Sequence, residues 1–270
     1  MQTYSLIFLD IDGTLLDSNH QIMPKTKRIL NRLEQRGVPI VLSSARSPSG
    51  VEVVERQAGL HSPVVCYGGS LILDRSRSIL GDTGIQSELA VSFKEFALDR
   101  FQDIMVSAYI YDIWLVDDVN HPAVQEEAKI SLCTPLAGDL RSAVQTLPHI
   151  HKLLCIGDQQ QITRLQKSAG ETFPQLNMIR SKATYLEVMP KGVSKRTAAE
   201  CFQTYYKVTR EEMVAFGDHF VDLELLRYAG VGVAMGNAPD EVKRAADRVT
   251  ASNDEEGIYL VLKNLRFSKL

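Results

Sequence analysis

The stretch YSLIFLDIDGTLLDS, residues 4–18, is a run of apolar residues that ends in two acids, Asp10 and Asp12. A continuous apolar run of this kind is typical of a parallel strand that is covered on both faces. Side chains two positions apart in extended backbone point the same way. Two carboxylates about 4 Å apart would then repel by about 4 kcal/mol at an effective dielectric constant of about 20. The stretch therefore predicts a buried strand that ends at a site holding a cation or a proton.

Strand and helix patterns alternate on both sides of a segment with a different composition. Buried-strand patterns recur at 38–46, 62–69, 212–218 and 231–235, with helical patterns between them. This alternation is typical of right-handed crossovers in an α/β fold, and it predicts a doubly wound, mainly parallel, Rossmann-like sheet. The last helix is expected at 239–249, with Pro239 near its first turn.

The middle of the chain lacks this alternation. Residues 104–118 are rich in aromatic and β-branched side chains, which favours a hairpin or an edge strand. We therefore expect an inserted α+β cap domain at 83–184 and a core formed by 1–82 and 185–270.

Composition limits the classes of partner and compartment. A net charge of −3 over 270 residues argues against a nucleic-acid partner bound through a broad basic surface. The four cysteines lack zinc-site spacing, and there is neither a leader peptide nor an apolar run of about 18 residues. These features predict a cytoplasmic protein with no membrane partner, and they say nothing about oligomeric state. His149 and His151 have no acidic or thiol partner at ligand spacing, so we expect surface or packing roles for them.

Polar residues gather where the predicted core strands end. The carboxyl ends of parallel strands form the usual site of an open α/β sheet. The residues expected there are Asp10, Asp12, Ser43, Ser44, Arg46, Asp218 and Asp222, with Lys195 if its helix starts at the same edge. Carboxylate oxygens suit Mg²⁺, which also binds phosphate oxygens, and a carboxylate near Mg²⁺ and a lysine can attack phosphorus. These residues therefore predict a magnesium site that binds a phosphate ester and attacks its phosphorus.

Four motifs in order carry a family resemblance. DIDGTLLDS (10–18), VLSSAR (41–46), MPKGVSK (189–195) and FGDHFVDLELL (216–226) resemble the four motifs of the haloacid dehalogenase-like (HAD) superfamily. GVGVAMGNAPDEVKRAADRVT (230–250) resembles the carboxyl-terminal signature of its Cof-type phosphatase branch. The resemblance spans nearly the whole chain, and it implies a Mg²⁺-dependent phosphatase whose cap selects the substrate.

The resemblance also implies a role for each matching residue. Asp10 is expected to be the nucleophile and a metal ligand. Asp12 is expected to be the general acid and base and to offer its backbone carbonyl to the metal. Lys195, rather than the nearby Lys191, is expected to offset charge between nucleophile and phosphate. The other expected site residues are Ser44 for the transferring phosphoryl group, Asp218 and Asp222 for the metal, and Gly13, Thr14, Ser43, Ala45 and Arg46 for phosphate or substrate.

The chain departs from the family pattern at three places. Val221 replaces the usual Asn of the fourth motif, which removes a hydrogen-bond donor near the metal or phosphate. Ala45 stands where the second motif normally has Gly, and Gly68–Gly69 replaces an expected Asn-Gly pair. None of these changes touches the nucleophile, the acid/base, the lysine or the metal acids.

The expected function is hydrolysis of a small phosphorylated metabolite, such as a sugar phosphate, through an aspartyl phosphate. Two alternatives stay open. A phosphotransferase or sugar phosphomutase would return a phosphorylated product, and a non-catalytic phospho-ligand sensor would bind without turnover.

Overall fold

The computed structural model describes residues 2–131 and 133–268, which divide into two compact units. We call residues 1–45, 51–81 and 194–270 the core unit, and residues 46–50 and 82–193 the inserted unit. Each unit is described below by itself.

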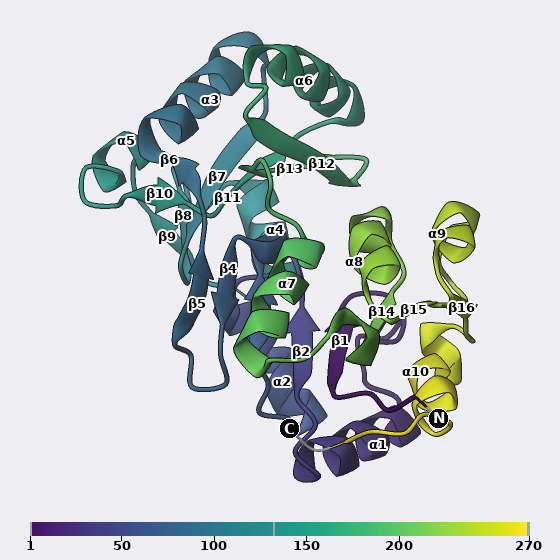
Figure 1. Ribbon diagram of the computed structural model, residues 1–270. Coiled ribbons are helices and arrows are strands. Elements are labelled where there is room, and N and C mark those ends of the chain that lie inside the picture. Colours follow the sequence, from purple (N-terminus) through teal and green to yellow (C-terminus); the bar gives the residue numbers. More distant parts are fainter. Residues whose placement is uncertain (1, 132, 269–270) are drawn as a thin grey trace. The chain divides into compact units, whose positions relative to one another are not determined.

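The core unit contains the alternating strands and helices (Figure 1). Its strands are β1 (Leu6–Asp10), β2 (Ile40–Ser43), β3 (Val64–Cys66), β4 (Leu71–Leu73), β5 (Ile79–Asp82), β14 (Met213–Gly217), β15 (Val231–Ala234) and β16 (Arg248–Val249). Its helices are α1 (Pro24–Gln35), α2 (Pro48–Ala58), α7 (Lys195–Tyr206), α8 (Leu223–Tyr228), α9 (Asp240–Ala245) and α10 (Gly257–Leu262), with 3-10 turns η1 (Tyr67–Gly69), η2 (Arg210–Glu212), η3 (Phe220–Asp222) and η4 (Asn253–Glu255).

The core sheet has the strand order β16-β15-β14-β1-β2-β3-β4-β5. Its pairs from β16 to β3 are parallel, and β4 joins β3 antiparallel. All five residues of β1 are buried, and Leu6 and Phe8 pack with α7, α8 and α9. Because side chains alternate along a strand, the burial of Ile7 and Leu9 shows that the opposite face is covered too. The fold is thus the expected doubly wound α/β sheet.

The strand order reverses at β1. From β1 the sheet grows in one direction through β2 and β3 and in the other through β14 and β15. Ligands of open α/β sheets bind at this kind of switch point, outside the carboxyl ends of the strands. The fold therefore directs attention to the residues that follow β1, β2, β14 and β15.

The inserted unit is an α+β unit. Its strands are β6 (Ile85–Gln86), β7 (Met105–Ile110), β8 (Ile113–Val116), β9 (Pro135–Ala137), β10 (His149–Ile150), β11 (Lys152–Ile156), β12 (Leu176–Lys182) and β13 (Tyr185–Pro190), and its helices are α3 (Ser87–Arg100), α4 (Pro122–Ser131), α5 (Leu140–Ala143) and α6 (Gln159–Thr172).

Six of these strands form one sheet in the order β12-β13-β11-β7-β8-β9. Helices α3 and α6 lie side by side on it (Figure 1), where Phe93 and Leu165 pack against the strand residues Val106, Leu153 and Leu186. The expected hairpin at 104–118 is the antiparallel pair β7–β8. The longest described helices, α3 and α6, have 14 residues each, and no helix in the described ranges could cross a membrane.

The prediction of a last helix at 239–249 is wrong in its second half. Helix α9 ends at Ala245, and Arg248–Val249 forms the edge strand β16 beside β15. The Asp247 carboxylate accepts a hydrogen bond from the Gly232 amide at 2.8 Å, and the Asp247 amide donates to the Gly232 carbonyl at 3.0 Å. This long-range pairing replaces the last helical turn, and one further helix, α10, follows.

The second boundary of the insertion also differs from the expected position. Strand β13 pairs antiparallel with β11 and β12, so it belongs to the inserted unit, and the core unit resumes at Ser194 instead of residue 185. A buried apolar strand such as YLEVMP fits either sheet by its pattern alone, because only pairing decides its unit.

Candidate functional site

The polar residues of the core unit meet at the ends of its central parallel strands. Asp10 is the last residue of β1 and pairs in register with Ser43, the last residue of β2. Asp218 follows β14 directly, and Asp222 ends the 3-10 turn η3 just after it. Three segments far apart in the sequence therefore place their side chains at one edge of the sheet.

Lys195 is the centre of a buried ionic cluster. Its amine donates to Asp10 Oδ1 and, at 2.5 Å, to Asp222 Oδ1. Lys195 is 3% exposed and Asp222 is fully buried, so both charges depend on protein partners. Ser194 starts α7 with a capping box to Thr197, which fixes the helix start and with it the position of Lys195.

Asp222 also holds the loop after β14. Its Oδ2 accepts hydrogen bonds from the amides of Asp218 at 3.1 Å and His219 at 3.0 Å. A Cβ at Gly217 would lie 2.5 Å from the Asp222 Cβ, so this tight turn requires glycine. Asp222 thus positions Asp218 while it pairs with Lys195.

The loop after β1 brings a second contact to Asp218. Thr14 Oγ1 donates to Asp218 Oδ1 at 2.7 Å. Gly13 has φ +85°, and a Cβ there would lie 2.3 Å from Asp218 Oδ2. Glycine is needed at this position both for the left-handed backbone and for the close approach of the carboxylate.

The site carries more negative charge than its lysine offsets. Burial, followed by the neighbouring Asp222 and Asp218, raises the pKa of Asp10 well above its usual value although Lys195 opposes the shift. Burial likewise raises the pKa of Asp218, with Asp222 adding to the shift. Burial would lower the pKa of the Lys195 amine, but the charges of Asp10 and Asp222 outweigh it and raise that pKa. The cluster is therefore ready to accept a further positive charge.

Three carboxylates are arranged to share a cation. Oxygen atoms of Asp10, Asp218 and Asp222 all lie within 4.8 Å of one another. Hard oxygen ligands of this kind suit Mg²⁺. The side chain of Asp12 is not in this group; the residue is exposed, next to Asp10 in the same loop. The donor set and its excess charge both fit a divalent cation.

The remaining expected residues are placed as follows. Ser43 Oγ is buried and has no hydrogen-bond partner in the described structure, which leaves a hydroxyl for a ligand. Ser44 is buried after β2, with its amide bonded to the Val65 carbonyl. Ala45 ends the same core segment, whereas Arg46 begins the segment 46–50 of the inserted unit. The Lys191 amine is exposed, lies in the inserted unit and donates to the Pro174 carbonyl at 3.1 Å.

Asn237 is a site residue that the sequence reasoning missed. Its side-chain amide donates to the Gly13 carbonyl at 2.8 Å and to Asp218 Oδ2 at 3.4 Å. It follows β15, which pairs parallel with β14, so its carboxyl end lies at the same sheet edge. Asn237 thus supplies a side-chain amide donor beside Asp218, in a chain where Val221 replaces the usual Asn of the fourth motif.

We expect Asn237→Ala to lower the turnover of a phosphate ester about 10- to 100-fold, because residues that orient metal ligands typically contribute effects of this size. The measurement is kcat and KM with an aryl phosphate at saturating Mg²⁺. Asn264→Ala is the matched control, because the exposed side chain of Asn264 donates to the Leu260 carbonyl at the end of α10, outside the carboxylate cluster. Equal turnover in both variants would contradict a role for Asn237.

Comparison with known proteins identifies similar chains. A family model described as haloacid dehalogenase-like hydrolase matches residues 7–262. A protein of Haemophilus influenzae that is provisionally named a phosphatase is 35% identical over 260 residues, which cover 96% of this chain and 97% of the relative. The 5-amino-6-(5-phospho-D-ribitylamino)uracil phosphatase of Bacillus subtilis is 28% identical over 267 residues, which cover 96% of each chain.

A solved structure has the same fold over nearly the same length. The crystal structure of a haloacid dehalogenase-like hydrolase from Bacteroides thetaiotaomicron superposes with a TM-score of 0.88 at 28% identity, covering 97% of this chain and 99% of the other. The similarity thus includes both the core unit and the inserted unit.

Proposed function

The chain belongs to the haloacid dehalogenase-like hydrolase family and is a phosphatase of that family, and on this premise we propose that it hydrolyses a small phosphorylated metabolite in a Mg²⁺-dependent reaction through a phosphoaspartate on Asp10. The observation that carries the proposal is the buried cluster of Asp10, Asp218 and Asp222 around Lys195. A structural ion pair would need one acid for the lysine, whereas three acids suit a cation and an anionic ligand.

In the first step, a carboxylate oxygen of Asp10 forms a bond to phosphorus while the bond from phosphorus to the leaving oxygen breaks. Asp12 gives its proton to that leaving oxygen. The Lys195 amine opposes the effect of burial on the pKa of Asp10, so it favours the ionised carboxylate, and it reduces the repulsion between that carboxylate and the phosphate. The hydroxyls of Ser43 and Ser44 are suited to donate to phosphate oxygens.

In the second step, Asp12 takes a proton from a water molecule, whose oxygen bonds to phosphorus as the bond to Asp10 breaks. Inorganic phosphate is released and Asp10 is regenerated. Asp12 is suited to this double role because it is exposed, two residues beyond the buried nucleophile, where protons can exchange with solvent.

Asp10, Asp218 and Asp222 would hold Mg²⁺ together with the backbone carbonyl of Asp12. When bound, the ion supplies positive charge that lowers the energy of the phosphate in the transition state. Thr14 and Asn237 hold Asp218 in place for this task, since each donates to one of its two carboxylate oxygens.

We expect chelation by EDTA to abolish phosphate release from an aryl phosphate and added Mg²⁺ to restore it. Asp218→Asn should weaken apparent Mg²⁺ affinity about 10- to 100-fold, because it removes one charged ligand. Asp99→Asn, on an exposed position of α3, is the control and should leave the Mg²⁺ dependence unchanged. Full activity in EDTA would overturn the metal assignment.

The substrate class is proposed from the relatives. The curated phosphatase of Bacillus subtilis acts on a phosphorylated ribitylamino-uracil, which is a small phosphomonoester. A screen of phosphorylated sugars, polyols and nucleotides tests this class by released phosphate. An isomeric phosphorylated product would identify a mutase, and binding without turnover would identify a sensor.

A further inference from the structure

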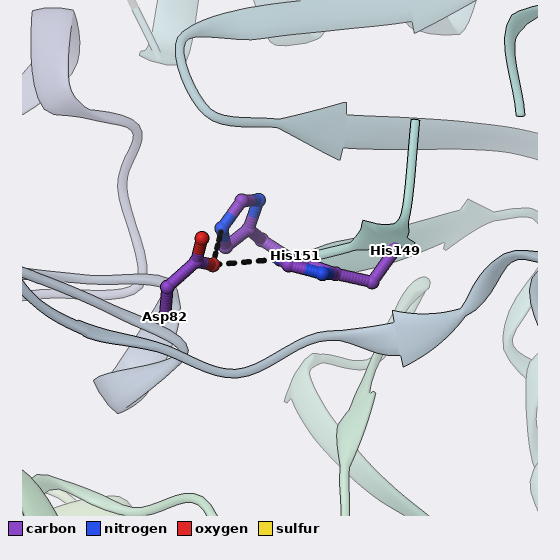
Figure 2. A group of neighbouring side chains, drawn as sticks. All are labelled: Asp82, His149 and His151. Atoms are coloured by element: carbon purple, nitrogen blue, oxygen red, sulfur yellow. Dashed lines mark hydrogen bonds and ion pairs between the residues drawn. The ribbon is translucent and has the colours of Figure 1, made fainter. Parts of the chain in front are cut away.

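A second cluster of titratable groups lies where the chain enters the inserted unit. Asp82 is the last residue of β5 and the first residue of the inserted unit in this part of the chain. Figure 2 shows its carboxylate beside the rings of His149 and His151. The sequence offered these histidines no acidic partner at ligand spacing, so surface or packing roles were expected, and the fold brings in a partner that lies 67 residues before His149.

Both carboxylate oxygens of Asp82 accept hydrogen bonds. His149 Nε2 and His151 Nε2 lie 2.6 Å and 2.9 Å from Oδ1, and the Tyr111 hydroxyl donates to Oδ2 at 3.0 Å. The three rings also contact one another, with centroids of His151 4.8 Å from Tyr111 and 5.1 Å from His149. Two segments of the inserted unit, the β7–β8 turn and residues 149–151, therefore converge on one side chain.

The backbone determines which nitrogen of His151 carries the proton. The Tyr111 amide donates to His151 Nδ1 at 3.0 Å, so this nitrogen accepts with its lone pair and carries no proton. The neutral ring then carries its proton on Nε2 and donates it to Asp82. A metal ion on Nε2 would require that lone pair and would move the proton to Nδ1, where it would face the Tyr111 N–H. The contacts of His151 therefore favour a proton-linked cluster over a metal site.

The packing around the cluster is specific. A Cβ at Gly84 would lie 2.2 Å from the His149 ring, so the backbone leaves room for this ring. Tyr111 is a non-glycine residue with φ +51° in the β7–β8 turn, a conformation that needs external support. The bonds to His151 and Asp82 hold Tyr111 in that conformation.

We propose that Asp82, His149, His151 and Tyr111 form a proton-sensitive latch that fixes the entry of the chain into the inserted unit and loosens in mild acid. Uptake of a solvent proton by His151 Nδ1 converts the acceptor of the Tyr111 N–H into a second donor. The hydrogen bond from the Tyr111 amide to His151 is then lost, while the hydrogen bond from the Tyr111 hydroxyl to Asp82 stays.

The direction of the pH effect follows from the groups that face His151, which are Asp82 from β5, His149 from β10 and Tyr111 from the turn. Burial lowers the pKa of His151 from its ordinary 6.5, although Asp82 opposes the shift. Because the folded pKa is below the unfolded one, the unfolded state binds more protons in acid, and the stability contribution is lost as pH falls below about 6.5.

Asp82 adds a second, more acidic step. Burial would raise the pKa of Asp82, but hydrogen bonds from His149, Tyr111 and His151 together outweigh burial and lower that pKa. The contribution of Asp82 is therefore present above its unfolded pKa and lost only as pH falls further. The latch is complete at neutral pH and opens first at His151.

The test measures the Tyr111 amide and the His151 ring directly, without reference to catalysis. In wild-type protein, the protection of the Tyr111 amide against hydrogen exchange, corrected for intrinsic rates, should fall at least about threefold between about pH 7.5 and about pH 5.5. His151→Asn keeps an oxygen acceptor for that amide and cannot titrate, so its protection should stay constant. His121→Asn is the matched control, since exposed His121 accepts from the Ala123 amide at 3.2 Å and lies outside the cluster.

If His151→Asn does not fold, the ¹⁵N chemical shifts of the His151 ring in wild-type protein test the same proposal, because they report which ring nitrogen carries a proton. The latch predicts a bare Nδ1 on His151 at neutral pH and protonation only below its ordinary pKa. A proton on Nδ1 at neutral pH, or the same pH dependence of the Tyr111 amide in His151→Asn and wild type, would overturn it. Stoichiometric Zn²⁺ binding that is lost in Asp82→Asn would overturn it in favour of a metal site.

Discussion

Asp10→Asn should lower kcat by at least about 10⁴-fold, because an amide of the same shape cannot form the phosphoaspartate. The variant should nevertheless fold. Burial and neighbouring acids raise the pKa of Asp10, so its ionised form is costly in the protein without metal, and a neutral side chain relieves that cost. The melting temperature without Mg²⁺ is therefore expected to equal or exceed that of the wild type.

The measurement combines steady-state hydrolysis of an aryl phosphate with thermal unfolding. Asp99→Asn is again the control for an exposed Asp-to-Asn change and should behave as wild type in both. Turnover within about tenfold of wild type in a purified Asp10→Asn sample would exclude Asp10 as the nucleophile. A folded variant with no turnover supports the assignment.

Lys195→Met should destabilise the protein without metal by about 3–5 kcal/mol and also reduce turnover, because it leaves two buried carboxylates without their cation. Asp222 is fully buried and Asp10 is 8% exposed, so solvent cannot replace the lost amine. Methionine keeps most of the aliphatic stem, so the loss reflects the charge more than the packing. Mg²⁺ should recover part of the stability, because it offsets the same charges.

Lys191→Met is the matched control for this substitution. Lys191 is exposed, and its amine donates only to the Pro174 carbonyl in the contacts described above, so its loss should cost less than about 1 kcal/mol. Urea unfolding with and without Mg²⁺ measures both variants. Equal stability losses in the two would show that the Lys195 cluster does not support the fold.

Most of the core unit could be predicted from local patterns. The strand at 6–10 is continuously apolar because both faces of β1 are covered, and helix α7 starts at a Ser with a capping partner three residues later. The predicted strand ends were enough to place Asp10, Ser43, Asp218 and Asp222 at one site, because the carboxyl ends of parallel strands lie at the same edge of the sheet. The contacts of Lys195, as opposed to those of Lys191, became visible only in the structure.

The features that were missed depend on contacts distant in sequence. Strand β16 exists because Asp247 bonds to Gly232, and no pattern within 239–249 distinguishes it from a helix end. The sequence near Asn237 resembles an ordinary turn, and its role becomes visible only from its contacts with Gly13 and Asp218 in the folded chain. No acidic residue lies near His149 and His151 in the sequence, because Asp82 is brought beside them only when the chain folds.

The proposed phosphoaspartate can be tested most directly by acid quench and mass spectrometry. Wild-type protein is mixed with p-nitrophenyl phosphate and Mg²⁺, quenched in acid within the first turnovers, and digested with pepsin. The account predicts one added phosphoryl group on the peptide that contains Asp10, sensitive to hydroxylamine and absent in Asp10→Asn. Turnover with no phosphorylated peptide, or a phosphoryl group on any other residue, would contradict it.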